Sequence, residues 1–152
     1  LGLPYSFASH FAPRMLVQAI QLYRENFEPS QYLDKPYVSM GVPTVIADSD
    51  EEAEYLATSA YQRVLGLMRG QSLKLKAPVK DMNALWSPAE KMSVDNFYAM
   101  AQIGSPETVK QSLEQLLVPY DVDEFIFTCD IYDTKKRKYN FDLLMQIKNQ
   151  SH

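Results

Sequence analysis

The chain is poor in the residues that build disulfide frameworks and metal sites. Its 152 residues include one cysteine, two histidines and five glycines. A single thiol, Cys129, excludes an internal disulfide framework, and its apolar neighbours indicate a buried thiol in a reducing cytoplasm. No basic residue next to it in the sequence marks it as a nucleophile. The sequence also has no glycine-rich phosphate loop, no cluster of metal ligands and no nucleophile elbow.

Long apolar runs and an excess of positive charge are absent as well. No stretch approaches the roughly 20 apolar residues that cross a bilayer, and the first residues lack the basic start of a signal peptide. With 15 basic and 19 acidic residues, the net charge is -4. We therefore expect neither nucleic acid nor membrane as a partner. The densest basic run, residues 135–138, is interpreted as a solvated helix edge rather than a binding patch.

The residues that are present favour one folded domain over 1–152, because 46% are hydrophobic and 12% aromatic. Residues 5–8 predict a short strand, and the spacing of Leu16, Ile20, Tyr23 and Phe27 predicts an amphipathic helix after it. Residues 37–47 predict a strand covered on both faces. Pro43 cannot donate to a ladder, so we expect a bulge, a bend or two shorter strands there.

Capping signals divide the rest of the chain. Ser49 and Glu52 have the spacing of a capping box at the start of a helix that Gly70 closes. Residues 105–107 begin another helix, residues 122–129 form a second convincing strand, and a last helix follows. Residues 71–103 are an irregular excursion in which 94–101 could be a short helix.

This alternation predicts an α/β fold with parallel strands joined by right-handed helical crossovers. About three β-α units do not close a (β/α)₈ barrel, which takes about 250 residues. The fold is then either a small open sheet or an incomplete part of a TIM-type barrel. The chain starts at Leu1 without an initiator methionine, in a segment typical of a helix end that turns into a strand. We expect a cut inside a larger fold.

Five segments, in order, resemble the bacterial-luciferase-like flavin-dependent monooxygenases. Each is weak alone, since acidic helix starts and Gly-Ser-Pro-Glu turns are ordinary capping chemistry, but together they cover nearly the whole chain. They are Leu1-Gly2-Leu3-Pro4-Tyr5-Ser6-Phe7-Ala8-Ser9-His10-Phe11-Ala12-Pro13, Tyr23-Arg24-Glu25-Asn26-Phe27-Glu28-Pro29-Ser30, Ala47-Asp48-Ser49-Asp50-Glu51-Glu52-Ala53, Gly104-Ser105-Pro106-Glu107-Thr108-Val109, and Val122-Asp123-Glu124-Phe125 through Ile131-Tyr132-Asp133 to Arg137.

The resemblance implies the C-terminal portion of a (β/α)₈ barrel that uses reduced FMN, dioxygen and a small-molecule substrate. In such enzymes much of the flavin pocket lies in the N-terminal half, which has no counterpart here. A Gly-Ser-Ser turn that contacts the flavin would precede Leu1. The resemblance therefore implies an oxidoreductase whose C-terminal part is inactive alone and possesses no complete FMN site.

Candidate site residues lie at or after the ends of the first and last predicted strands, residues 5–8 and 122–129. These ends are at the rim where barrels of this type place their chemistry. His10 could bind flavin or substrate or transfer a proton near neutral pH, or it could cap the helix that begins at Pro13. Ser9, Phe7 and Phe11 are candidate flavin contacts, and for the two phenylalanines ordinary core packing is the alternative.

After the final strand come Asp130, Asp133 and Arg137. Arg137 could meet a phosphate of the cofactor, or it could pair with Asp133 four residues earlier. The ion pair is the favoured interpretation.

Two other functions stay open. The chain could be a non-catalytic truncated barrel that hides its exposed strand edges by forming a homo-oligomer, because unpaired parallel edges invite pairing. It could also be a small α/β binding domain.

Overall fold

The structure, a computed structural model, describes residues 2–8, 15–72 and 74–150. In this part of the chain strands and helices alternate, as the sequence predicts, except that α3 follows α2 directly. Their order is β1 (Tyr5–Ala8), α1 (Leu16–Glu25), β2 (Val38–Ile46), α2 (Asp50–Met68), α3 (Pro88–Phe97), β3 (Gln102–Gly104), α4 (Pro106–Tyr120), β4 (Glu124–Thr128) and α5 (Thr134–Gln150). No helix among these residues is both long enough and apolar enough to cross a membrane.

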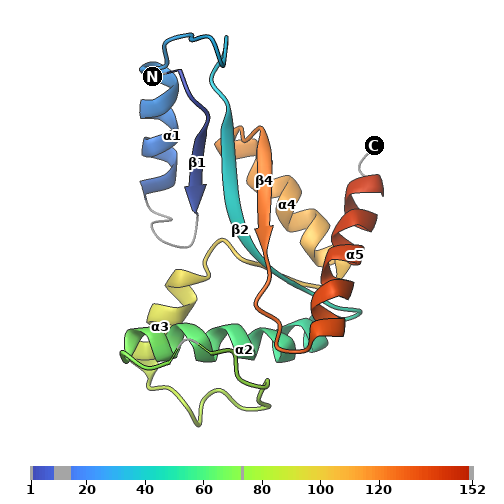
Figure 1. Ribbon diagram of the computed structural model, residues 1–152. Helices are drawn as coiled ribbons and strands as arrows, with labels where there is room; N and C mark the ends of the chain where they lie inside the picture. The colour runs from blue at the N-terminus through green and yellow to red at the C-terminus, as the bar shows by residue number, and fades with distance from the viewer. Residues whose placement is uncertain (1, 9–14, 73, 151–152) are drawn as a thin grey trace.

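Every pair of neighbouring strands is parallel, which confirms the prediction from the alternation. The central strand β2 pairs with β1, where Phe7 lies opposite Met40, and with β4, where Met40 lies opposite Phe125. The order β1-β2-β4 therefore places three strand–helix units side by side, as in an arc of a barrel (Figure 1). The fold is the incomplete TIM-type barrel expected from the sequence.

Pro43 marks a change of partner within β2. The pairing with β4 ends where Pro43 lies opposite Thr128, and the pairing with β3 begins at the next residue, where Thr44 lies opposite Gln102. The strand is continuous from Val38 to Ile46 and curves in its second half (Figure 1). Of the three outcomes expected at this proline, a bend is the one found.

One face of the sheet is covered by helix and the other is open. On the covered face, Phe7, Met40 and Phe125 share one apolar cluster with Leu16 and Ile20 of α1. The alternate residues of β1 and β4 point to the other face, and they are exposed: Ser6, Ala8, Glu124, Ile126 and Thr128. In a complete barrel, side chains from all eight strands cover the inner face. An arc of the barrel leaves that face exposed.

Helices α2 and α3 lie across the end of the sheet at which β2 and β4 finish (Figure 1). The Ser49 hydroxyl caps α2 by accepting a hydrogen bond from the Glu52 N–H at 3.2 Å. The Glu52 carboxylate contacts Lys136 of α5 at 2.5 Å. The start of α2 is thus tied to the start of α5.

The irregular excursion is more ordered than the sequence suggests, and the expected helix at 94–101 is misplaced. Helix α3 begins at Pro88, where Ser87 and Glu90 form a complete capping box. Glu90 also holds Arg69, just beyond α2, at 2.8 Å. The short strand β3 ends the excursion and was not predicted, since three residues are too few to show a periodic pattern.

Candidate functional site at the strand ends

The carboxyl ends of the strands gather at one edge of the sheet. β1 ends at Ala8, which lies opposite Gly41, and β4 ends at Thr128, which lies opposite Pro43. In parallel α/β folds the residues that follow these ends carry the chemistry. The candidate residues Ser9, His10 and Phe11 directly follow β1 but lie outside the described residues, so their roles stay predictions.

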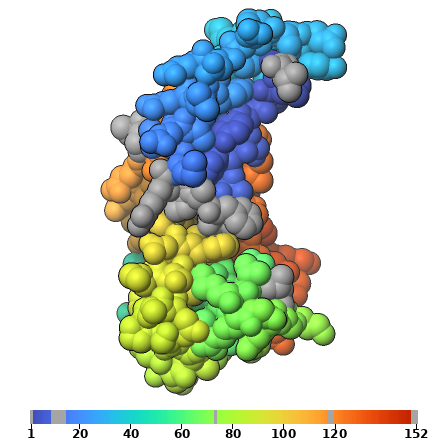
Figure 2. All heavy atoms as spheres, turned by 90° about the vertical axis from the view of Figure 1, so that its left-hand side faces the viewer, coloured from blue at the N-terminus to red at the C-terminus, as the bar shows by residue number. Residues whose placement is uncertain are grey.

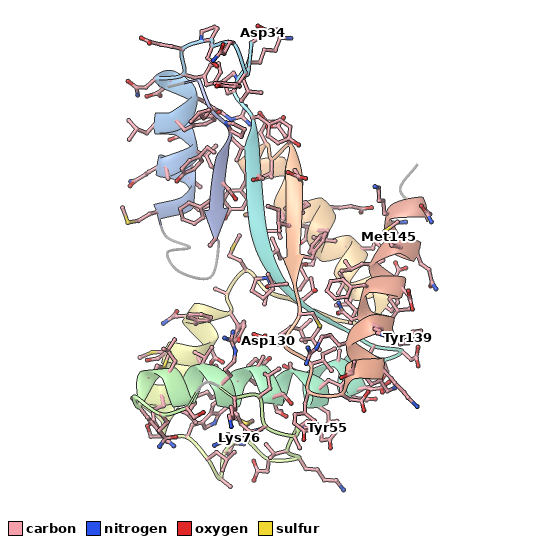
Figure 3. The ribbon with its side chains drawn as sticks, in the orientation of Figure 1. Asp34, Tyr55, Lys76, Asp130, Tyr139 and Met145 are labelled. Atoms are coloured by element: carbon pink, nitrogen blue, oxygen red, sulfur yellow. The ribbon has the colours of Figure 1, made fainter. Side chains whose placement is uncertain are left out.

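A cleft of about 240 Å³ opens at this edge, between the strand ends and the helices that cross them. We call it the rim cleft. Its lining comes from β2, α2, the end of α3, and β4 with the turn after it: Pro43, Arg63, Phe97, Tyr98, Thr128 and Asp130. Figure 3 labels Asp130 between the end of β4 and α2. The cleft therefore joins the excursion to the barrel rim.

An ion pair forms the polar side of the rim cleft. Arg63 Nη2 lies 2.5 Å from Asp130 Oδ2, and about a third of each side chain is exposed, 33% and 34%. The buried Nε of Arg63 has no hydrogen-bond partner among the residues that the structure describes. Asp130 was expected at this rim from the sequence. Arg63 was not, because an arginine within a helix carries no sequence signal that it reaches a strand end 67 residues away.

Tyr98 is the second polar group that the sequence did not reveal. Its hydroxyl donates a hydrogen bond to the Ala60 carbonyl at 3.3 Å. Burial, together with the charge of Asp130, raises the pKa of Tyr98 to about 12, although Arg63 opposes the shift. The phenol therefore stays neutral near pH 7 and serves as a hydrogen-bonding group rather than a base.

The raised pKa of Tyr98 predicts a loss of stability at high pH. The pKa is 10.0 for a free tyrosine and about 12 in the fold. The stability that the neutral Tyr98 contributes is therefore fully present below pH 10. It is lost as the pH rises towards 12, because tyrosine in the unfolded chain ionises first. Over this range the wild type should lose on the order of 2 kcal/mol more unfolding free energy than Tyr98→Phe, measured by urea titration.

The matched control is Tyr32→Phe, because Tyr32 is 68% exposed. This variant should follow the wild-type pH dependence. Equal pH dependence in Tyr98→Phe and the wild type would contradict the burial of an uncharged Tyr98.

Phe7 lies on the helix-covered face of the sheet. Its ring is 6.4 Å from that of Tyr5, and it packs in the same cluster as Leu16 and Ile20 of α1. This placement favours the alternative of core packing. A contact between Phe7 and flavin stays a prediction.

The expected ion pair between Asp133 and Arg137 is wrong. The Arg137 guanidinium donates two hydrogen bonds to the Ile131 carbonyl, at 2.9 and 2.7 Å. Asp133 turns instead to the start of α5, where it accepts a hydrogen bond from the Lys136 N–H at 2.9 Å. Asp133 caps α5 because the first N–H groups of a helix have no partner within the helix. The phosphate role of Arg137 stays a prediction.

The described residues offer no group of three or more His, Cys, Asp or Glu side chains that could hold a metal ion. Burial raises the pKa of Cys129 to about 11, which keeps the thiol protonated near neutral pH. The cleft thus contains an ion pair, a neutral phenol, a hydroxyl and an aromatic ring, which suit recognition of a small polar aromatic molecule.

Known proteins match the chain along almost its full length. It is 42% identical over 147 residues to the uncharacterized protein YvbT of Bacillus subtilis, covering 97% of the chain and 44% of that protein. It is 41% identical over 150 residues to a luciferase-like monooxygenase of Escherichia coli K12, covering 99% and 45%. The chain thus spans less than half the length of these relatives. No family model matches it.

Solved structures share the fold. The crystal structure of apo-MsnO8 superposes with a TM-score of 0.77 at 20% identity, covering 98% of the chain and 46% of that protein. Riboflavin lyase RcaE, solved with modified FMN and riboflavin, superposes with a TM-score of 0.50 at 17% identity, covering 97% and 39%.

Proposed function

This chain belongs to the luciferase-like monooxygenase family, as a C-terminal portion, and from that premise we propose that it supplies the closing strands and part of the substrate rim of a reduced-FMN-dependent monooxygenase. The observation that carries the proposal is the 41% identity to the E. coli luciferase-like monooxygenase across 99% of the chain. A cytoplasmic location is part of the same proposal.

The rim cleft fits one wall of a flavin or substrate pocket. Its volume of about 240 Å³ is smaller than the roughly 300–1,000 Å³ of complete ligand sites. Phe97, Tyr98 and Thr128 offer ring, phenol and hydroxyl to an aromatic ligand, but these residues alone do not enclose one. In this proposal the second wall comes from the rest of the barrel, since the chain spans less than half the length of these relatives.

In this proposal each residue has a limited task. Reduced FMN, when bound, supplies the activation of dioxygen. His10 holds or moves a proton near neutral pH, and Ser9 and Phe11 contact the flavin, whereas Phe7 packs against α1. Arg137, which the Ile131 carbonyl holds, would bind a phosphate of the cofactor. Tyr98 and the Arg63–Asp130 pair orient the substrate from the rim.

The chain alone is proposed to be inactive, and complementation tests this. The chain would be co-expressed with the part of the E. coli relative that precedes its match. The mixed complex should bind FMN, measured by quenching of flavin fluorescence, and should change the rate at which dioxygen oxidises reduced flavin from the rate without protein. The chain alone should do neither. Flavin binding by the chain alone, or a stable mixed complex without it, would overturn the proposal.

A second candidate role is self-association of a truncated barrel. The exposed positions Ala8, Ile126 and Thr128 on the open face, together with β1, whose described pairing is to β2, favour it. Sheet edges and apolar faces of this kind are usually covered in natural proteins.

A further inference from the structure

A second, larger hollow lies between α2 and residues 79–95. Its volume is about 510 Å³, and it shares no lining residue with the rim cleft. We call it the α2 groove. Figure 2 shows the yellow-green segment of the excursion packed beside the green helix α2, and Figure 3 labels Tyr55, one of the lining residues. The groove therefore stands apart from the proposed flavin chemistry and does not depend on it.

Two aromatic rings form an adjoining pair in the α2 groove. The rings of Tyr61 and Trp86 lie 6.0 Å apart at 37°. Tyr55 also lines the groove, and 41% of it is exposed. Faces of aromatic rings attract organic cations through the ring quadrupole, with tryptophan the strongest.

The chain already places one cation against this aromatic pair. Lys91 Nζ lies 5.7 Å from the centroid of the Trp86 ring and 2.6 Å from Asp95 Oδ2. Because both Lys91 and Asp95 are about half exposed, 48% and 55%, this ammonium can leave its position at low cost. The Trp86 ring and the Asp95 carboxylate are thus the two kinds of group that bind an ammonium ion.

The charge of the α2 groove complements a cation. Four carboxylates and two lysines line it, which leaves a net charge of -2; they are Glu51, Glu54, Asp81, Asp95, Lys80 and Lys91. The Tyr61 hydroxyl donates a hydrogen bond to Glu54 Oε2 at 2.8 Å, so one carboxylate is held beside the aromatic pair. We propose that the α2 groove binds a small organic cation through an alkylammonium group seated on Trp86 and Tyr61, in the place that Lys91 otherwise occupies.

Trp86 itself reports on the site, because it is the only tryptophan in the chain. The intact chain would be titrated with choline while tryptophan fluorescence is recorded. We expect a saturable change. The neutral carbon isostere of choline, dimethylbutanol, should bind about tenfold more weakly, since it keeps the shape and lacks the charge.

Two lysine variants separate displacement of Lys91 from a general charge effect. Lys91→Met removes the ammonium that competes for Trp86, and it should tighten choline binding several-fold. Lys80→Met removes an equal charge from the same groove without vacating the ring, and it should change the affinity less. Glu54→Gln should weaken binding. Far-UV circular dichroism would establish that each variant is folded.

Three results would overturn the proposal. The first is no saturable fluorescence change beyond that caused by the same concentration of sodium chloride. The second is equal binding of choline and dimethylbutanol, which would make the groove a purely apolar site. The third is an equal gain in affinity from Lys80→Met and Lys91→Met, which would assign the effect to net charge alone.

Discussion

Replacing Asn140 with leucine is expected to lower the free energy of unfolding by about 2–4 kcal/mol. Asn140 is fully buried. Its Oδ1 accepts a hydrogen bond from the Ile46 N–H at 2.7 Å, and its Nδ2 donates to Thr44 Oγ1 at 3.4 Å. The pairing of β2 with β4 ends at Thr128, so this side chain from α5 replaces the missing strand partner. Leucine fills a similar volume and leaves a buried N–H unpaired.

The measurement is chemical denaturation of Asn140→Leu beside Asn149→Leu, the same change at an exposed position of the same helix. The control should stay within about 0.5 kcal/mol of the wild type. Two equally stable variants would show that the strand end does not depend on the Asn140 amide.

Replacing Gly104 with alanine is expected to cost about 2–5 kcal/mol, the sum of backbone strain and overpacking. The φ angle of Gly104 is 152°, a backbone conformation that residues with a Cβ rarely adopt. A Cβ there would lie 2.9 Å from Asp50 Oδ1 and from Thr108 Cγ2. Asp50 cannot easily move, because it accepts a hydrogen bond from the Ser105 N–H at 2.6 Å. The substitution thus disturbs the junction of α2 with α4.

Gly70→Ala isolates the backbone contribution. Gly70 also has a positive φ angle, 65°, but among the described residues no atom beyond the adjoining helix backbone and its chain neighbours lies within 4 Å of a Cβ built there. We expect Gly70→Ala to be destabilising by about 1 kcal/mol, clearly less than Gly104→Ala in the same denaturation measurement. Equal losses would mean that the contact with Asp50 and Thr108 does not matter.

Elements with strong local signals were predictable from the sequence. The helix at Asp50–Met68 follows from the Ser49 cap and its acidic first turn, and β2 follows from a β-branched apolar run. Parallel pairing follows from the alternation of these elements. In each case neighbouring residues carry the information, so a single sequence is enough.

Other features depend on contacts between distant residues and were missed or mistaken. β3 forms by pairing with Thr44–Ile46, the part of β2 after Pro43, and no local sequence pattern predicts it. The Arg63–Asp130 pair forms because α2 crosses the strand ends. The mistaken pairing of Arg137 shows the same limit, since helical spacing allows the pair while the Asp133 cap prevents it.

The comparisons distinguish between the alternatives that the sequence left open for the fold. A small open-sheet α/β domain would not superpose on apo-MsnO8 over 98% of this chain with a TM-score of 0.77. The open face of the sheet then has a simple physical meaning. Its exposed residues, Ile126 among them at 46%, are the positions that face the interior when a barrel is complete.

Light scattering of the purified chain, with flavin absorbance recorded across the same peak, tests this account most directly. One chain has a mass of 17.4 kDa. An arc with an uncovered inner face should appear as a dimer or larger species without bound flavin. A monomer of 17.4 kDa that carries FMN would contradict it, because such a molecule would bind flavin while no partner covers its open face.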